Sequence, residues 1–264
     1  MFGLALDPQT LVAILFVVFG LLAVVGVPVG IALGFSSMIV ITLDPRLTMW
    51  PFFQRSFYAL DSFVLLAVPL FLFTGTIMNA SKITDQLIDF SRNLIGPIKG
   101  GLAHVNVLVS MLFAGISGST NADSAGIGSV LIPAMKKEGY PVSISVAVTA
   151  ASSVMGVIIP PSILMVVWSS ITESSIAGMF LGGVVPGVII GASQMVLVGT
   201  LAYRRDYPST KFRGMRALLH SSKHGILAMG APLLIIGGII MGVFTPTEAA
   251  VAGILYCLFL SVVV

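Results

Sequence analysis

The chain has 264 residues, of which 57% are hydrophobic and only 9% are charged, and its net charge is +3. A soluble domain carries about 25% charged residues, so this composition excludes a soluble enzyme, a nucleic-acid-binding protein and a disordered tail. It predicts an all-α polytopic membrane protein. The single cysteine, Cys257, excludes an internal disulfide framework and a cysteine-built metal site.

The first apolar run covers residues 10–42 and is too long for one straight span of about 20 residues. Gly26-Val27-Pro28 interrupts the run, and proline removes a backbone hydrogen-bond donor. We therefore expect two short spans, at 10–26 and 28–43. One long kinked helix is the alternative.

Residues 1–101 are expected to form scaffold helices and an amphipathic arm. Tryptophan and arginine beside apolar residues indicate an interfacial segment at 44–60, and a further span follows at 61–80. Leucine, phenylalanine and isoleucine at helical spacing predict an amphipathic surface helix within 81–100.

Residues 102–135 predict a re-entrant helical hairpin. Two apolar arms, 102–114 and 127–135, are each too short to cross about 30 Å of hydrocarbon, and the polar stretch 115–126 separates them. Lysines flank both outer ends, which the positive-inside rule places on the cytoplasmic side. A polar tip at membrane depth survives only inside protein or beside a wet cavity.

The next span, 142–170, is broken near its middle by Ile159-Pro160-Pro161-Ser162. A span at 179–203 leads into a stretch, 204–223, that holds six of the 13 lysines and arginines and is expected to be a cytoplasmic loop. The transport region is thus expected at 102–203.

Three histidines and one glutamate favour structural roles. His104, His220 and His224 have no clear chemical partner in the sequence. Thr245 and Pro246 before Glu248 are typical of a helix start, so Glu248 is expected to support a helix terminus.

The hairpin tip is rich in oxygen and in small residues. Hydroxyl, amide and carbonyl oxygens with a single carboxylate suit a hard monovalent cation such as sodium, whereas zinc prefers histidine or cysteine. The broken helix adds carbonyl groups at Gly156–Pro161 and the Ser162 hydroxyl. Asp123 could bind an ion, carry a proton or cap the returning arm.

Two other classes of function stay open. Gly115-Ile116-Ser117-Gly118 resembles the serine motif of rhomboid intramembrane proteases, but a serine nucleophile needs a base and no histidine follows closely. A membrane scaffold without transport activity is the other class. The chain has no Walker-type loop for ATP hydrolysis.

Five ordered motifs resemble the large membrane subunit, the DctM-like family, of tripartite ATP-independent periplasmic (TRAP) transporters. They are LDSFVLLAVPLFLFTGTIM (60–78), AGISGSTNADSAGIGS (114–129), IPAMKKEGYP (132–141), GVIIPPSI (156–163) and GVFTPTEAA (242–250).

The resemblance implies an ion-transporter-type elevator fold whose first inverted repeat contains the hairpin and the proline-broken helix. It implies sodium-coupled import of organic acids, such as C4-dicarboxylates or sugar acids, with no organic cofactor. The implied partners are a small four-helix membrane subunit and a periplasmic solute-binding protein, and the implied location is the bacterial inner membrane.

The resemblance also implies site residues. The implied sodium ligands come from the hairpin and the broken helix: Ser117, Gly118, Ser119, Asn121, Gly156, Pro160, Pro161 and Ser162. The implied substrate-binding residues surround the tip: Ser119, Thr120, Asn121 and Asp123.

Family members have a second, inverted half with its own hairpin and broken helix. Here GVPVGIALG (26–34) and GVFTPTEAAVAG (242–253) are weakly similar, so residues 224–264 are expected to begin a second repeat. The chain is expected to be an N-terminal portion of such a subunit.

Overall fold

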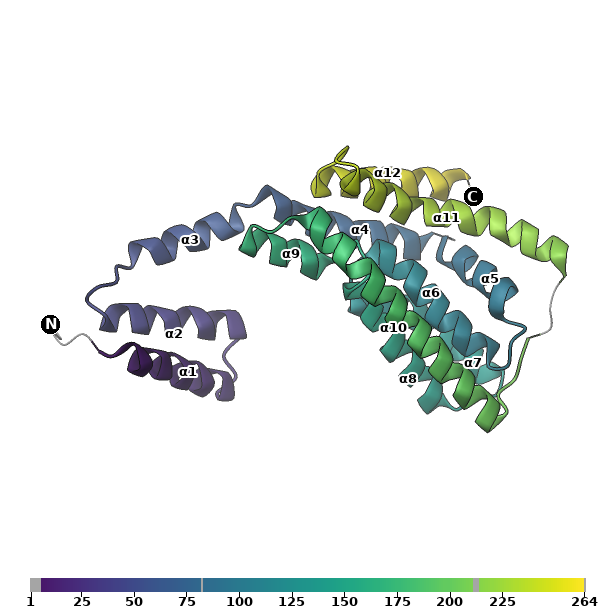
Figure 1. Cartoon of the computed structure of the whole chain (residues 1–264), viewed down its shortest axis with the longest axis horizontal. Helices are drawn as coiled ribbons and strands as arrows, with labels where there is room; N and C mark the ends of the chain where they lie inside the picture. Colours follow the sequence, from purple (N-terminus) through teal and green to yellow (C-terminus); the bar gives the residue numbers. More distant parts are fainter. Residues whose placement is uncertain (1–5, 82, 211–213, 264) are drawn as a thin grey trace. The chain divides into compact units, whose positions relative to one another are not determined.

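The computed structural model describes residues 6–81, 83–210 and 214–263, and within these ranges every regular element is a helix (Figure 1). They form two compact units, Met1–Ser62 and Phe63–Val264. An all-helical fold is therefore confirmed for the part of the chain that the structure describes.

The first unit contains α1 (Pro8–Val24), α2 (Val29–Leu43) and α3 (Trp50–Leu60). Helices α1 and α2 pack against each other, and residues 25–28 form the turn between them. The alternative of one long kinked helix is therefore wrong. Helix α3 falls within the segment expected at the membrane interface, and that location stays a prediction.

The second unit starts with a short 3-10 helix, η1, that runs directly into α4 as one apolar stretch. Eight further α-helices and one more short 3-10 helix follow. The elements are η1 (Phe63–Leu66), α4 (Ala67–Ala80), α5 (Ile83–Ile95), α6 (Gly101–Ser117), α7 (Thr120–Lys137), α8 (Val142–Ser153), η2 (Val154–Val157), α9 (Ile163–Thr172), α10 (Ile176–Arg205), α11 (Met215–Ile240) and α12 (Pro246–Val263).

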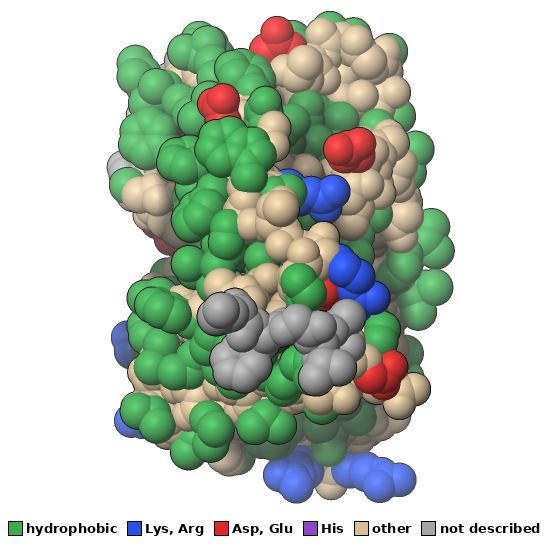
Figure 2. All heavy atoms as spheres, turned by 90° about the vertical axis from the view of Figure 1, so that its left-hand side faces the viewer, with side chains coloured by type: hydrophobic (Ala, Val, Ile, Leu, Met, Phe, Trp, Pro, Cys, Tyr) green, Lys and Arg blue, Asp and Glu red, His purple; other side chains and the backbone are tan. Residues whose placement is uncertain are grey.

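Three stretches of the described chain are long and apolar enough to cross a membrane: Phe63–Ala80, Ile176–Arg205 and Met215–Ile240. Helices α1, α2, α6, α9 and α12 are apolar but shorter. Hydrophobic side chains cover much of the face shown in Figure 2, and charged side chains are sparse on it. This surface suits a lipid environment rather than water.

Helix α6 occupies the core of the second unit. It packs against α4, α5, α7, α8, α10 and α11, and most of its residues are buried. Phe113, Leu102 and Ile116 are among the largest fully buried side chains. A helix that is buried on nearly every side can place polar groups where water is excluded, so polar residues on α6 need internal partners.

Several boundaries differ from the sequence-based expectation because helical backbone continues through polar residues. Helix α7 begins at Thr120, so most of the polar stretch 115–126 is helical rather than irregular. Helix α11 begins at Met215, so the second half of the expected basic loop is helical too. Lys211 and Arg213 lie outside the described residues.

The amphipathic helix expected within 81–100 is α5, but its buried face is rotated. The helical spacing of Leu87, Phe90, Leu94 and Ile95 predicts the apolar face. Of these, Leu87 is fully buried, whereas Leu94 is 47% exposed, and Ile83 and Ile88 are buried as well. The reason is that α5 packs between α6 and α11, which selects the face that holds Ile83 and Leu87.

Candidate functional site: two interrupted helices that meet

The candidate site lies where the turn of the helical hairpin, α6 and α7, meets the break in the span expected at 142–170. The turn between α6 and α7 consists of Gly118 and Ser119, and the break covers residues 158–162. The Ile163 amide donates a hydrogen bond of 3.3 Å to the Gly118 carbonyl oxygen. A Cβ atom on Gly118 would lie 2.7 Å from the Pro161 carbonyl oxygen, and Gly118 has φ +60°. Glycine is therefore required here both for its backbone conformation and for the close approach.

Four helix ends converge at this contact. Helices α6 and η2 end there, and α7 and α9 begin there. Ser119 caps α7 by accepting a hydrogen bond from the Ala122 amide at 3.4 Å, and Ser162 caps α9 by accepting one from the Met165 amide at 3.4 Å. Helix C-termini attract cations and N-termini attract anions, so both kinds of ligand find a complementary helix end.

The break leaves carbonyl oxygens without hydrogen-bond donors. Among the described residues, none donates a backbone hydrogen bond to the carbonyl oxygens of Ile158, Ile159, Pro160 or Pro161. The prolines interrupt the helical ladder, and the amides of Ile163 and Met165, which would reach residues 159 and 161 in a continuous helix, donate instead to the Gly118 carbonyl oxygen and the Ser162 hydroxyl. Unpaired carbonyl oxygens in a buried region suit a hard cation, which they can coordinate in place of water.

Asp123 brings a negative charge to the same place. Its side chain is fully buried, and the Ser117 hydroxyl donates a hydrogen bond to its Oδ1 atom. Its Oδ2 atom has no hydrogen-bond partner among the described residues. A Cβ atom on Gly156 would overlap this oxygen, so Oδ2 lies directly against the broken span. A buried carboxylate with one unpaired oxygen is costly unless a cation or a proton joins it.

The interpretation of Asp123 as a helix cap is wrong. The cap of α7 is Ser119, and Asp123 lies one turn further along the helix, where its own amide donates to the Ser119 carbonyl oxygen at 3.0 Å. The two remaining interpretations, an ion ligand and a proton carrier, both fit a buried carboxylate that lies against η2, just before the break.

The structure brings together most of the residues that the sequence suggests for this site. Ser117, Gly118, Ser119 and Asp123 lie against the broken span, since a Cβ atom on Gly156 would also lie 3.1 Å from the Ser119 carbonyl carbon.

Other suggested residues lie around this contact. The Pro160 carbonyl oxygen would lie 3.6 Å from a Cβ atom on Gly115, and the Ser162 hydroxyl donates to the Val157 carbonyl oxygen at 2.7 Å. Thr120 and Asn121 form the first turn of α7, and the Asn121 side chain is exposed.

Two neighbours of the site were missed from the sequence. A Cβ atom on Gly75 of α4 would lie 3.4 Å from Ser117 Cα, and one on Gly115 would lie 3.0 Å from Pro232 Cβ of α11. Helices α4 and α11 therefore pack directly against the end of α6. A glycine inside an apolar span and a proline inside a helix were the available signals, but neither reveals its partner.

A buried polar network fixes the hairpin to the broken span below the site. The Asn106 side chain donates to Thr149 Oγ1 at 2.7 Å, and the hydroxyls of Ser110 and Ser152 lie 2.9 Å apart. These groups satisfy one another across α6 and α8. Such interhelical hydrogen bonds are typical of packing inside membrane proteins, so the network supports the site without being part of it.

The serine-hydrolase alternative finds no support in the geometry. His104 lies 13 residues before Ser117 on the same helix, roughly 20 Å away at 1.5 Å per residue. Its Nδ1 atom lies 3.0 Å from the Gly100 carbonyl oxygen at the opposite end of α6. The described residues also contain no cluster of three or more histidine, cysteine or acidic side chains that could hold a metal ion.

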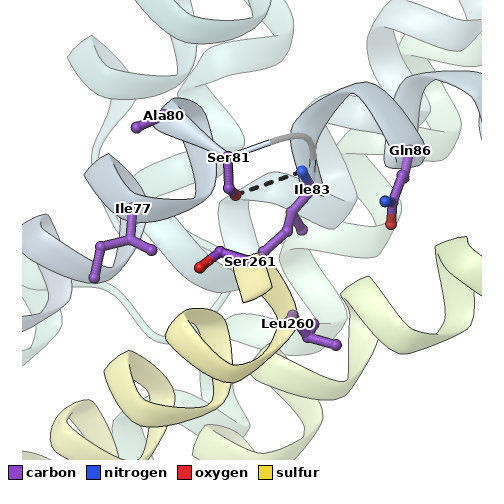
Figure 3. A pocket seen from close by; sticks show the side chains of 7 residues that line it. All are labelled: Ile77, Ala80, Ser81, Ile83, Gln86, Leu260 and Ser261. Atoms are coloured by element: carbon purple, nitrogen blue, oxygen red, sulfur yellow. Dashed lines mark hydrogen bonds between the residues drawn. The ribbon is translucent and has the colours of Figure 1, made fainter. Parts of the chain in front are cut away.

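A cavity of about 460 Å³ lies elsewhere, between the end of α4, the start of α5 and the end of α12 (Figure 3). Its polar side chains are Ser81, Gln86 and Ser261, and the Ile83 amide donates to the Ser81 hydroxyl at 3.5 Å. Among the described residues that line it, none is charged.

Comparison with known proteins gives consistent results. The family model of the tripartite ATP-independent periplasmic transporter, DctM component, matches residues 15–264. The chain is 39% identical to the sialic acid TRAP transporter permease protein SiaT of Haemophilus influenzae over 237 residues. This matched region covers 90% of the chain and 38% of SiaT.

Two relatives from Vibrio cholerae are similar to the chain. It is 38% identical to the sialic acid TRAP transporter large permease protein SiaM, over 90% of the chain and 56% of that protein. It is 36% identical to the C4-dicarboxylate TRAP transporter large permease protein DctM, over 95% of the chain and 55% of that protein. The chain thus spans between about two fifths and three fifths of these relatives' lengths.

The family is one of transporter permeases rather than enzymes, and its relatives are membrane proteins. Because the family model matches almost the entire chain, the protein belongs to the DctM component family of the tripartite ATP-independent periplasmic transporters.

Proposed function

We propose that this chain forms the part of a sodium-coupled organic-acid importer that holds a cation beside the substrate. The observation that carries the proposal is the Asp123 carboxylate, which is fully buried and has one oxygen without a hydrogen-bond partner among the described residues. A sodium ion beside that oxygen would offset the cost of burying the charge.

The donor set fits sodium. The Asp123 carboxylate would supply the only full negative charge, and carbonyl oxygens of the break at 158–161 would supply neutral ligands. Hydroxyls from Ser117 and Ser119 complete a set of oxygens without histidine or cysteine, which suits a hard monovalent cation. Gly118, Asn121, Gly156 and Ser162 would shape the same site.

The substrate carboxylate is proposed to meet the first turn of α7. Ser119, Thr120 and Asn121 begin this helix, where unpaired amides and the helix dipole favour an anion. A cation held at Asp123 would attract the same carboxylate. Binding of the ion and of the acid would therefore favour each other, and this mutual dependence is the basis of coupled transport.

The relatives support an organic acid as the substrate class, because their names refer to sialic acid, C4-dicarboxylates and 2,3-diketo-L-gulonate. We propose that residues 102–203 form the moving part of an elevator, with 102–135 as a re-entrant hairpin. We also propose a small four-helix membrane subunit and a periplasmic solute-binding protein as partners in the bacterial inner membrane.

The test measures sodium binding and transport separately. The purified chain is heated in detergent with sodium, potassium or choline chloride at equal ionic strength. We expect sodium alone to raise its melting temperature, since a ligand that binds only the folded state stabilises it by about 2.7 kcal/mol at 100 times its Kd.

Uptake of a panel of organic acids is then measured in proteoliposomes that hold the complete transporter. Equal melting temperatures in all three salts, together with uptake that ignores sodium, would exclude the proposal.

A further inference from the structure

Helix α10 carries three buried glycines spaced four residues apart, Gly183, Gly187 and Gly191. This spacing puts them on one face of the helix. Each glycine inside a helix costs roughly 1 kcal/mol of stability relative to alanine, so three glycines on one helix face need a compensating contact. All three face the hairpin or the broken span.

The contact of Gly183 differs in kind from the other two. A Cβ atom on Gly183 would overlap the carbonyl oxygen of Ile158, which is backbone and belongs to the break. A Cβ atom on Gly187 would overlap the Ile159 side chain, and one on Gly191 would overlap the flexible end of the Met111 side chain. Only at Gly183 must the backbone of the break move to admit a methyl group.

This matters because η2, which leads directly into the break, lies against Asp123 at Gly156. The Gly118 carbonyl oxygen accepts the Ile163 amide on one side of the break, and Gly183 of α10 lies against Ile158 on the other. The free carbonyl oxygens between these two contacts are the neutral ligands of the proposed cation site. Their positions therefore depend on how closely α10 approaches.

We propose that Gly183 is a positioning residue for the cation site: it admits the Ile158 carbonyl oxygen against α10 and so sets where the break lies relative to Asp123. The inference rests on the proposed function, because the affinity it controls is that for sodium. Gly187 supports the same segment through the Ile159 side chain, and its effect is smaller.

The experiment compares Gly183→Ala with Gly182→Ala. The two glycines are neighbours in α10, but a Cβ atom on Gly182 meets nothing within 4 Å. Both variants gain the same helix propensity, so the difference between them reports the contact with the Ile158 carbonyl oxygen and with the flexible end of the Met165 side chain, which can move more easily. The measured quantity is the sodium concentration for half-maximal thermal stabilisation of the chain and for half-maximal uptake by the complete transporter.

We expect Gly183→Ala to raise the half-saturating sodium concentration roughly tenfold, the effect of modest overpacking, with Gly182→Ala unchanged within about twofold. Maximal uptake at saturating sodium should fall less than the apparent sodium affinity. Faster hydrogen exchange of the Ile163 amide in Gly183→Ala alone would report the displaced break directly. A purely structural glycine would lower the melting temperature and leave the half-saturating sodium concentration unchanged, which would overturn the inference.

A compensating pair of substitutions, at Gly187 and Ile159, tests the inference if Gly183→Ala does not fold. Gly187→Ala should raise the half-saturating sodium concentration, and Gly187→Ala combined with Ile159→Ala should restore most of it, because the second change removes the overlapping atoms. A pair whose effects simply add would contradict the inference. If sodium does not stabilise the wild-type chain, the proposed function itself fails. If the wild type responds to sodium but neither Gly183→Ala nor the Gly187→Ala pair changes that response, only the role of Gly183 fails.

Discussion

The two ends of the α6–α7 hairpin, its tip and its base, differ in how their charged groups are paired. At its tip, the turn at Gly118 and Ser119 lies against a break in a neighbouring span, and the buried Asp123 forms no ion pair with any described residue. At its base, two ion pairs join oppositely charged side chains. Lys99 Nζ lies 2.6 Å from Asp206 Oδ1, and Arg92 Nη2 lies 3.4 Å from Glu138 Oε1.

Backbone hydrogen bonds reinforce the base. The Gly100 amide donates to the Pro208 carbonyl oxygen at 3.1 Å, and the Thr210 amide donates to the Gly96 carbonyl oxygen at 3.1 Å. The Tyr140 and Tyr207 rings pack with their centroids 5.0 Å apart. The start of the hairpin and the end of α10 are therefore tied together by contacts that need no ligand.

The difference teaches where a ligand is required. Ion pairs at an exposed base are individually weak, and water can solvate a charge there that has no partner. The tip buries a carboxylate and free carbonyl groups, which is unfavourable until a cation joins them. The same two helices thus have one end whose ion pairs need no ligand and one end where, in the proposed function, a cation would complete the set of oxygens.

The largest expected effect comes from removing the charge at the tip. Asp123→Asn keeps the shape of the side chain but removes its full negative charge. We expect the half-saturating sodium concentration to rise by roughly 10-fold to 150-fold, the range for losing an interaction with a charged group, and uptake to fall accordingly. In sodium-free buffer the variant should be at least as stable as the wild type, because it no longer buries an unpaired charge.

Asp85→Asn is the matched control, because Asp85 is an exposed acid in the first turn of α5. It should change neither the melting temperature nor the sodium dependence measurably. A sodium response in Asp123→Asn equal to that of the wild type would remove this carboxylate from the ion site.

A smaller effect is expected from one hydroxyl at the tip. Ser119→Ala removes a neutral oxygen and the cap of α7. Loss of the cap costs about 0.5–2 kcal/mol of stability. Loss of the ligand should raise the half-saturating sodium concentration by about tenfold, the scale of one buried polar partner.

Ser175→Ala separates these two consequences. Ser175 caps α10 in the same way, accepting the Gly178 amide at 3.2 Å, but it is exposed. The two variants should lose similar stability, and only Ser119→Ala should shift the sodium dependence. Equal shifts in both variants would show that helix capping, rather than ion binding, explains the role of Ser119.

The sequence predicts the helices of this fold well and their contacts poorly. Apolar runs with proline and glycine interruptions located the turn at residues 25–28 and the break at 158–162, because both features act locally on the backbone. The polar content of 115–126 suggested an irregular tip, yet α7 begins at Thr120. Polar residues are compatible with helix when buried partners satisfy them, and the sequence does not reveal those partners.

The site shows the same limit. The convergence of hydroxyls and a carboxylate near Ser117 was visible in the pattern, but the position of Asp123 one turn inside α7 was not. Nor did the pattern reveal that Gly156 packs against Asp123 and Gly183 against Ile158, since glycine spacing has meaning only once its neighbours are known. Long-range packing, rather than local propensity, decides which oxygens can share one ion.

The smallest effect is expected at the base, with Asp206→Asn. Lys99 holds the pKa of the Asp206 carboxyl below its ordinary value of 3.8, through a hydrogen bond and through charge attraction. A lowered folded-state pKa means that the pair stabilises the protein above the ordinary pKa and loses this contribution as the pH falls through the lowered value. Asp206→Asn should therefore lower the melting temperature slightly at neutral pH and not at all in strong acid.

The pair is exposed, with 85% of the Asp206 side chain accessible, so the change should be small and should shrink further in concentrated choline chloride. The half-saturating sodium concentration should stay within about twofold of the wild type, because an exposed ion pair at this end of the hairpin is weak and far from the tip. If Asp206→Asn weakened the sodium response as strongly as Asp123→Asn, the two ends would not be independent, and ion binding at the tip would depend on the charge balance of the base.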